Sequence, residues 1–255
     1  MNLISMAIYS HSRLGCFQNC PWQYKLRYID QVKRDRTGIE AYVGSCFHAV
    51  MEKLYSELPF KVNTLDELLG YYNAWWAKNW TEDIAITRKN RTAEDYRNSG
   101  ITCLKDYYKR YQPFNQSKVL GVEREVLFNL DPEGKYCLRG CIDRLAQAGN
   151  GIYEIHDYKT SANLPSQEEA DNDQQLALYQ IAVQGLWNDV KEIRLIWHYV
   201  LFDKELVSIR SQGQLDKLKA DTISLIQAIE SARDFPAIES ALCDWCAYPD
   251  LCPKH

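Results

Sequence analysis

The chain has 255 residues, of which 46% are hydrophobic and 25% are charged, and its formal net charge is -4 at pH 7. This composition is typical of a globular protein and excludes a disordered or fibrous chain. The negative charge also argues against a protein that coats nucleic acid non-specifically, because such binding needs many Lys and Arg contacts to phosphate. A local basic groove remains compatible with it.

Compartment and cysteine usage are linked. No apolar run has the length of a membrane-spanning helix, and the start, MNLISMAIYSHS, lacks the charged-then-apolar pattern of a secretory signal. We therefore expect a cytoplasmic protein without a membrane partner. In that compartment the nine cysteines are not expected to form disulfides, so clustered ones indicate a metal and scattered ones indicate small buried side chains.

Helical patterns dominate the first half of the chain. Residues 9–29 predict two helices that are separated at Cys20, which precedes a proline. Residues 38–55 have an apolar stripe at helical spacing that includes His48, and a histidine in such a stripe is more often a core residue than a ligand. Residues 58–117 predict two or three more helices, with aromatic stripes that indicate packing, as an insertion over the site.

Three strands follow. Residues 119–130 alternate between apolar and polar side chains, and the turn signal at 131–134 leads into a second strand that reaches Asp143. The sequence Gly-Asn-Gly at 149–151 then separates this strand from a third one, residues 152–158. The pattern predicts a meander of three strands.

The second and third strands carry the candidate chemistry. Because strand side chains alternate between faces, Asp157 and Lys159 project from the same side, where Asp143 of the neighbouring strand can meet them. Two carboxylates and an ammonium group are costly to gather unless a cation lies between the acids. The pattern favours a divalent metal site, and the alternative is a solvated hairpin.

The rest of the chain completes an α/β pattern. A long helix is expected from about residue 166 to 187, in which Gln175 and Tyr179 are four apart and share one face. A strongly apolar strand at 192–202 and a final helix at 214–235 follow. The predicted order is strand, strand, strand, helix, strand.

Three cysteines cluster at the C-terminus. Cys243, Cys246 and Cys252 are separated by two and then five residues, and a closed thiolate site usually needs four ligands. Cys20 is the natural fourth ligand, and Cys16, one helical turn earlier, is its competitor. Thiolates bind zinc as well as iron–sulfur clusters, so the spacing leaves the metal open.

These motifs together resemble a known family. Asp143, a gap of thirteen residues and then Asp157-x-Lys resembles the PD-(D/E)xK nuclease superfamily, and GCIDR at 140–144 with DYKT at 157–160 is similar to its RecB-like branch. Ile142 stands where the superfamily name has proline. The resemblance implies an α/β, restriction-endonuclease-like core: a mixed central sheet flanked by helices, with a helical insertion and an iron–sulfur-stapled subdomain at the two termini.

The resemblance also implies roles for the site residues. His48, in a Gly-x-x-x-His pattern, would bind Mg²⁺ or Mn²⁺ together with Asp143 and Asp157, and the carbonyl of Tyr158 would be a further ligand. Lys159 would orient and help to deprotonate the attacking water, or stabilise charge on the phosphate. These residues would form the catalytic centre.

Further positions match the family less specifically. Gln175 and Tyr179 fit its Gln-x-x-x-Tyr motif and would position the DNA strand. Glu123 matches an acidic residue often found beside the metal, and an ordinary exposed strand glutamate is an equal alternative.

The cysteines indicate which group within the RecB-like branch the chain resembles. An early Cys-Pro and a late C-x2-C-x5-C are similar to the iron–sulfur nucleases of this branch, which include the CRISPR-associated adaptation exonucleases and the AddB nuclease domain. By this likeness, a [4Fe-4S] cluster would be held by four residues: Cys20, Cys243, Cys246 and Cys252. Such a cluster would staple the first helix to the last segment.

The expected function is that of a metal-dependent DNA exonuclease acting on single-stranded DNA or overhangs. Its expected partners are DNA and CRISPR adaptation or recombination proteins, and an oligomer is left open. The alternatives are a non-catalytic DNA-binding or scaffold module and an RNA or structure-specific nuclease. The expected domains are an iron–sulfur subdomain of residues 1–37 with 236–255, a helical region at 38–118 and the nuclease core at 119–235.

Overall fold

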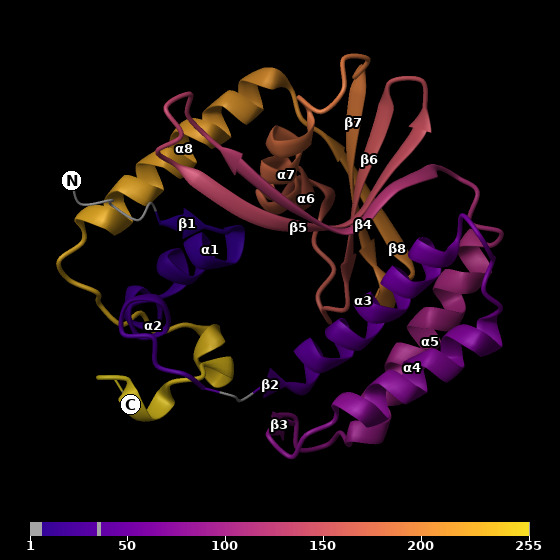
Figure 1. Ribbon diagram of the computed structural model, residues 1–255. Helices are drawn as coiled ribbons and strands as arrows, with labels where there is room; N and C mark the ends of the chain where they lie inside the picture. Colours follow the sequence, from indigo (N-terminus) through magenta and orange to yellow (C-terminus); the bar gives the residue numbers. More distant parts are fainter. Residues whose placement is uncertain (1–6, 35–36, 255) are drawn as a thin grey trace. The chain divides into compact units, whose positions relative to one another are not determined.

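The computed structural model describes residues 7–34 and 37–254, and the chain forms two compact units (Figure 1). The first unit contains Met1–Arg36, Val126–Gly140 and Ser211–His255. The second contains Thr37–Glu125 and Cys141–Arg210. Two long strands, β4 (Lys118–Asn129) and β5 (Cys137–Gly149), run through both units.

The second unit is built on a mixed sheet. Its strands are parts of β4 and β5, which pair with each other, then β6 (Ile152–Lys159), β7 (Glu192–Tyr199) and β8 (Lys204–Ile209). β5 and β6 pair antiparallel, β6 and β7 parallel, and β7 and β8 antiparallel. The turn between β5 and β6 needs glycine at Gly151, which has φ +80° and where a Cβ would lie 2.3 Å from a backbone oxygen. The predicted α/β fold, a mixed central sheet flanked by helices, is confirmed.

Three helices of this unit pack on one another: α3 (Ile39–Glu57), α4 (Leu65–Asn79) and α5 (Ala93–Tyr111). Thr64 and Thr92 begin α4 and α5 with capping boxes, which satisfy backbone N–H groups of the first turn. Phe47, Tyr72 and Leu104, one from each helix, are fully buried in a core that also includes Tyr158 of β6. The aromatic stripes of the sequence therefore serve core packing.

The single helix expected at 166–187 is wrong. The chain forms α6 (Gln167–Asn172) and α7 (Gln175–Val183), and between them Asp173 takes an extended conformation with ψ 135°. Arg210 stabilises the break, because its guanidinium donates to the carbonyls of Ala170 at 2.9 Å and Asp173 at 3.1 Å. Helix α7 also ends earlier than expected, and Trp187 instead stacks on Tyr153 with ring centroids 4.3 Å apart.

The strand expected at 192–202 is also too long. β7 ends at Tyr199 and is followed by a 3-10 turn, Val200–Phe202. Asp203 then adopts a left-handed conformation with φ 45°, which returns the chain into β8. The sequence analysis did not predict this last strand.

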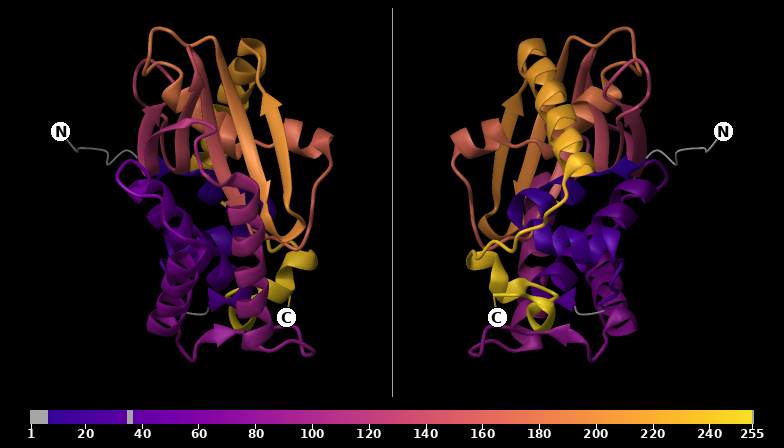
Figure 2. Two further views of the ribbon diagram at one scale, coloured as in Figure 1. Left: turned by 90° about the vertical axis from the view of Figure 1, so that its right-hand side faces the viewer. Right: turned by 90° about the vertical axis from the view of Figure 1, so that its left-hand side faces the viewer.

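The first unit joins both ends of the chain. β1 (Ile8–Tyr9) pairs with the start of β5. The helices of this unit are α1 (His11–Asn19), α2 (Pro21–Tyr24) and, much later in the chain, α8 (Gln212–Ser231). The C-terminal segment carries two 3-10 turns, Ala241–Trp245 and Pro249–Leu251, and Figure 2 shows it beside the N-terminal helices. Trp22 Nε1 donates to the carbonyl of Leu251 at 3.0 Å, and the Tyr248 hydroxyl donates to that of Val32 at 3.0 Å.

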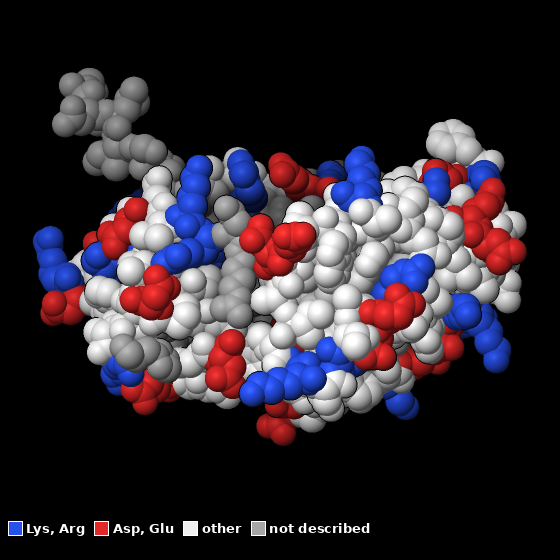
Figure 3. Space-filling view, turned by 90° about the horizontal axis from the view of Figure 1, so that it is seen from below, with Lys and Arg blue, Asp and Glu red and all other residues white. Residues whose placement is uncertain are grey.

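Surface charge is mixed in sign. Lys and Arg side chains lie among Asp and Glu side chains on the face drawn in Figure 3. On this face, therefore, neither sign of charge forms a continuous patch of its own. Within the described part of the chain, none of the helices combines the length and apolar character that crossing a bilayer would demand.

Candidate metal centre

Strand β6 ends in an ordered carboxylate–amine pair. The Lys159 ammonium lies 2.8 Å from Asp157 Oδ2, and Asp157 is 3% exposed. Gln175, at the start of α7, joins the two, because its Oε1 accepts from Lys159 Nζ at 2.8 Å and its Nε2 donates to Asp157 Oδ1 at 2.9 Å. The amide thus fixes the directions of both charged groups.

Asp143 and His48 approach the same strand through its backbone. Asp143 Oδ2 accepts from the Tyr158 N–H at 2.8 Å, and His48 Nε2 donates to the Tyr158 carbonyl at 2.9 Å. His48 Nδ1 then lies 3.4 Å from Asp143 Oδ2. In this arrangement the Tyr158 carbonyl, expected as a metal ligand, is a hydrogen-bond acceptor of His48.

Glu123 completes the cluster, and its backbone conformation is unusual. It has φ 44°, which is costly for a residue with a side chain, and it lies within a strand. This conformation goes with a carboxylate 3.7 Å from His48 Nδ1. One ligand atom each from His48, Glu123 and Asp143 lies within 4.8 Å of the other two. Among the described residues, this is the group close enough to share one ion, and Asp157 lies outside it.

The electrostatics of the cluster favour a cation. Burial raises the pKa of Asp143 to about 7, with a further contribution from the charge of Asp157. Burial lowers the pKa of His48, but a hydrogen bond to Glu123 and the charges of Asp143 and Asp157 outweigh it and raise that pKa to about 9. The buried Asp157 Oδ2 has the Lys159 ammonium 2.8 Å away as its charge partner. Carboxylate oxygens with one imidazole suit Mg²⁺ or Mn²⁺, so the donor set fits a divalent cation.

An open groove of about 510 Å³ lies over this cluster, between α3 and Glu123. Small residues of α3 line it together with His48 and Glu52: Ala41, Gly44, Ser45 and Ala49. A Cβ at Gly44 would lie 3.1 Å from Thr160 Oγ1, so glycine lets the helix lie close to the end of β6. The cluster can therefore be reached along a wide surface.

The family model of the PD-(D/E)XK nuclease superfamily matches residues 8–253. The chain belongs to this superfamily. Its members are nucleases that use divalent metals, and a His, Glu and Asp centre beside an Asp-x-Lys strand agrees with that chemistry. The protein is accordingly a nuclease, and DNA is the substrate expected of it.

One similar solved structure supports the fold. The crystal structure of a candidate exonuclease from Eubacterium rectale has a TM-score of 0.57 and 13% identity, and the match covers 96% of this chain and 90% of that one. The structure of SSO0001 is 17% identical over 92% of this chain and 94% of that one, but its TM-score of 0.36 is too low to carry an argument. No curated protein matches the sequence.

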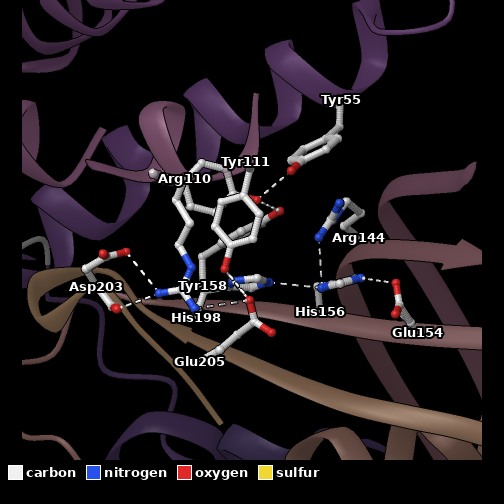
Figure 4. A network of polar contacts seen from close by, with 11 residues as sticks. Tyr55, Arg110, Tyr111, Arg144, Glu154, His156, Tyr158, His198, Asp203 and Glu205 are labelled. Atoms are coloured by element: carbon white, nitrogen blue, oxygen red, sulfur yellow. Dashed lines mark hydrogen bonds and ion pairs between the residues drawn. The ribbon is translucent and has the colours of Figure 1, made fainter. Parts of the chain in front are cut away.

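The nuclease also has a buried polar network around His156 and His198, which the sequence analysis did not predict (Figure 4). Arg144 is 4% exposed and donates to His156 Nδ1 at 2.8 Å, and this nitrogen lies 2.9 Å from His198 Nε2. Because arginine can only donate, His156 Nδ1 must be an acceptor, and its Nε2–H is left to donate to Glu154 at 3.2 Å. His198 stacks on Tyr158 with ring centroids 5.0 Å apart, so the network supports the strand segment that holds His48 and Asp143.

Tyr179 lies on α7, one turn after Gln175, and is 8% exposed. Burial raises its pKa to about 12, and the charges of Asp157 and Asp143 add to this effect. Of the predicted Gln-x-x-x-Tyr pair, Gln175 therefore contacts Asp157 and Lys159 directly, and Tyr179 is close enough to feel the charges of Asp157 and Asp143.

The predicted cysteine ligands lie in the first unit of the nuclease. Cys20, Cys243, Cys246 and Cys252 line one cavity together with Trp22 and Tyr248. Burial raises the pKa of Cys246, and the other three thiols contribute to the increase through their charge. Cys16 does not line this cavity and is buried, with its Sγ 3.8 Å from Gln23 Oε1. In the described ranges, no three cysteine sulfurs lie within 4.8 Å of one another.

Proposed function

We propose that this nuclease is a metal-dependent DNA exonuclease that cleaves single-stranded DNA or overhangs. The observation that carries the proposal is the convergence of His48, Glu123 and Asp143 beside the Asp157–Lys159 pair at the end of β6. The likeness to a candidate exonuclease supports attack on strand ends, and the open groove over α3 supports access for an unpaired strand.

Each residue has a part in the proposed reaction. His48, Glu123 and Asp143 would hold the cation, with Asp157 as a further oxygen ligand beside them. When bound, the cation supplies Lewis acidity that activates water and offsets charge on the phosphate. Lys159 donates to the attacking water or to a phosphate oxygen. Gln175 holds Lys159 by accepting one of its N–H groups, and it holds Asp157 by donating to it.

The test is digestion of end-labelled DNA with Mg²⁺, with Mn²⁺ or with chelator. We expect metal-dependent shortening of a linear single strand and no cleavage of a circular one. Duplex DNA with overhangs and an RNA of the same sequence, run beside it, distinguish a structure-specific or RNA nuclease.

Lys159→Ala is the decisive variant. It is expected to abolish cleavage while DNA binding persists, because the metal ligands remain. Lys217→Ala, which removes an exposed lysine paired with Asp221 on α8, is the matched control and is expected to cut normally. Unchanged cleavage by Lys159→Ala would refute the catalytic assignment, and absence of cleavage by the wild-type protein would favour the non-catalytic scaffold module.

We also propose that Cys20, Cys243, Cys246 and Cys252 hold a [4Fe-4S] cluster, as in the RecB-like iron–sulfur branch. All four line one cavity, which supports a shared ligand. Thiolate ligands also bind zinc, and the family resemblance is what favours the iron–sulfur cluster. Anaerobic purification followed by a visible spectrum and an iron and sulfide assay tests this assignment.

The domain division belongs to the same proposal. Residues 1–37 and 236–255 would form the cluster-binding part, 38–118 the helical region and 119–235 the nuclease core. The CRISPR adaptation or recombination proteins proposed as partners rest on the family resemblance. Co-purification of the protein from its native cells, with the cluster intact, is the measurement that would identify them.

A further inference from the structure

A second cavity in the unit that contains the metal centre opens beside the residue after Lys159. Its polar residues are Glu40, Arg88, Arg91, Tyr96, Ser99 and Thr160. Thr160 directly follows Lys159, and Glu40 lies on α3, the helix that also carries His48. His48, Glu123 and Asp143 do not line this cavity, so it is a separate site close to the chemistry.

Arg91 is held in one orientation within this cavity. Its Nη2 donates to Ser99 Oγ at 2.8 Å and to the Asp95 carbonyl at 3.3 Å. The guanidinium also lies over the Tyr96 ring, 4.2 Å from the centroid. A planar cation fixed in this way loses little further freedom when its remaining N–H groups donate to a ligand.

Glu40 places a carboxylate beside the arginines. The Tyr96 hydroxyl donates to its Oε1 at 2.9 Å, whereas Oε2 is shielded from solvent and has no hydrogen-bond partner among the described residues. Leaving such an acceptor unpaired is costly, so a ligand that brings N–H groups would stabilise this arrangement. The Glu40 carboxylate would repel a phosphate, and Val43 and Leu201 make part of the cavity wall apolar. Both features suit a base better than a phosphate.

We infer that this cavity binds one unpaired nucleobase of the substrate strand, next to the cleaved bond, and that it prefers guanine. Guanine offers the acceptors O6 and N7, which match arginine, and adjacent N–H donors on its other edge, which match a carboxylate. The inference rests on the proposed nuclease function and deepens it, because it adds a sequence preference to the cleavage. Arg88, which is exposed at the cavity, would contact the phosphate next to the bound base.

The test uses thymidine oligonucleotides that carry a single guanine at successive positions. We expect guanine at one fixed distance from the cleaved bond to raise kcat/KM about tenfold over thymine at that position. Inosine, which lacks the exocyclic amine, should retain only part of the increase. Glu40→Gln should bring the guanine-to-thymine ratio close to one.

Two matched variants control for surface charge. Glu94→Gln removes an exposed carboxylate that pairs with Arg97, and Lys89→Ala removes the cation next to Arg88 without touching the cavity wall. Both should keep the guanine preference of the wild-type protein. Because the readout is a ratio within one preparation, partial unfolding of a variant does not change it.

The outcomes separate this inference from the proposed function. Cleavage that is equal for all bases, a ratio that Glu40→Gln does not change, or a preference that follows a terminal phosphate would each overturn the guanine site. If no strand is cut at all, the nuclease proposal fails instead. The guanine ratio is then measured as binding affinity with Lys159→Ala protein, where equal affinities for guanine and thymine strands would also overturn it.

Discussion

The metal centre of the second unit and the cysteine cavity of the first differ in how they are held. The acids and His48 belong to β4, β5, β6 and α3, and the backbone of Tyr158 ties Asp143 and His48 together. Three of the four cavity cysteines lie in a C-terminal segment whose only regular structure among the described residues is two 3-10 turns of five and three residues. The fold therefore builds the first site, whereas the second is expected to depend on its ligand.

The largest expected effect is loss of the iron–sulfur centre that we propose for the cysteine cavity. Cys246→Ala should remove the iron and the visible absorbance, and it should also loosen the C-terminal segment, because metal–thiolate binding free energy of about 10 kcal/mol or more is folding free energy. Iron content, together with the rate of proteolysis of the segment after α8, measures both effects.

Cys16→Ala is the control for this prediction, since Cys16 is buried outside the cavity wall. It should keep the iron. If Cys16→Ala lost the centre while Cys20→Ala kept it, the fourth ligand would have been misassigned. If Cys246→Ala left the segment as resistant to protease as before, the contrast between the two regions would disappear.

The metal centre should instead respond to pH through proton release. The pKa of His48 is raised to about 9 and that of Asp143 to about 7, so in the metal-free protein both groups hold protons that a cation must displace. The stability that protonated His48 contributes is complete below its unfolded pKa and is lost as pH rises through about 9. The raised pKa of Asp143 lowers the stability of the metal-free protein as pH rises from its unfolded value to about 7.

Mn²⁺ affinity should therefore increase with pH, by up to about tenfold per pH unit for each proton released. Calorimetric titrations with Mn²⁺ on both sides of neutrality measure the slope. His48→Gln should flatten the slope on the alkaline side, whereas a slope that is identical in this variant would mean that His48 holds no proton in the free protein.

A substitution in the buried network around His156 should affect activity more than stability. Arg144 has a shielded Nε without a hydrogen-bond partner, and it forms no ion pair with a carboxylate of the described residues, so its burial costs solvation free energy. Stacking over the Tyr55 ring, 4.1 Å away, offsets part of that cost. Arg144→Met should thus change the free energy of unfolding by no more than about 1 kcal/mol, yet slow cleavage, because His156 loses a donor and β6 loses support.

Denaturant unfolding and single-turnover cleavage of the same preparation measure the two effects. Arg97→Met, which removes a surface ion pair with Glu94 on α5, should leave both unchanged. If Arg144→Met lowered the free energy of unfolding by several kcal/mol, the buried cation would stabilise the fold. The substitution would then not separate stability from activity.

Local rules were enough to place the main catalytic candidates. Period-two alternation put Asp157 and Lys159 on one face, and hairpin punctuation put Asp143 on the adjacent strand. Helical spacing likewise put Gln175 and Tyr179 side by side. Each of these inferences spans only a few residues and depends on backbone geometry that the sequence encodes locally.

What escaped prediction depends on partners that are distant in sequence. The helix break at Asp173 is stabilised by Arg210, 37 residues away, and the His156–His198 contact joins residues 42 apart. No local pattern signals either contact. For the network one clue existed: Arg144 follows Asp143 in the strand, so alternation already directed it to the opposite face.

The smallest effect concerns Glu123 and sharpens the idea that the fold builds the metal centre at a cost. Its φ of 44° is a conformation that glycine adopts without penalty, so Glu123→Gly should relieve strain of about 1 kcal/mol or more. The same substitution removes one of the three clustered ligands, and Mn²⁺ affinity should fall with it. Glu123→Asn, which tolerates the left-handed conformation and keeps an oxygen, should lie between glycine and the wild type in affinity. Metal-free stability that fell in Glu123→Gly would mean that the carboxylate, through His48, stabilises the strand more than the conformation strains it.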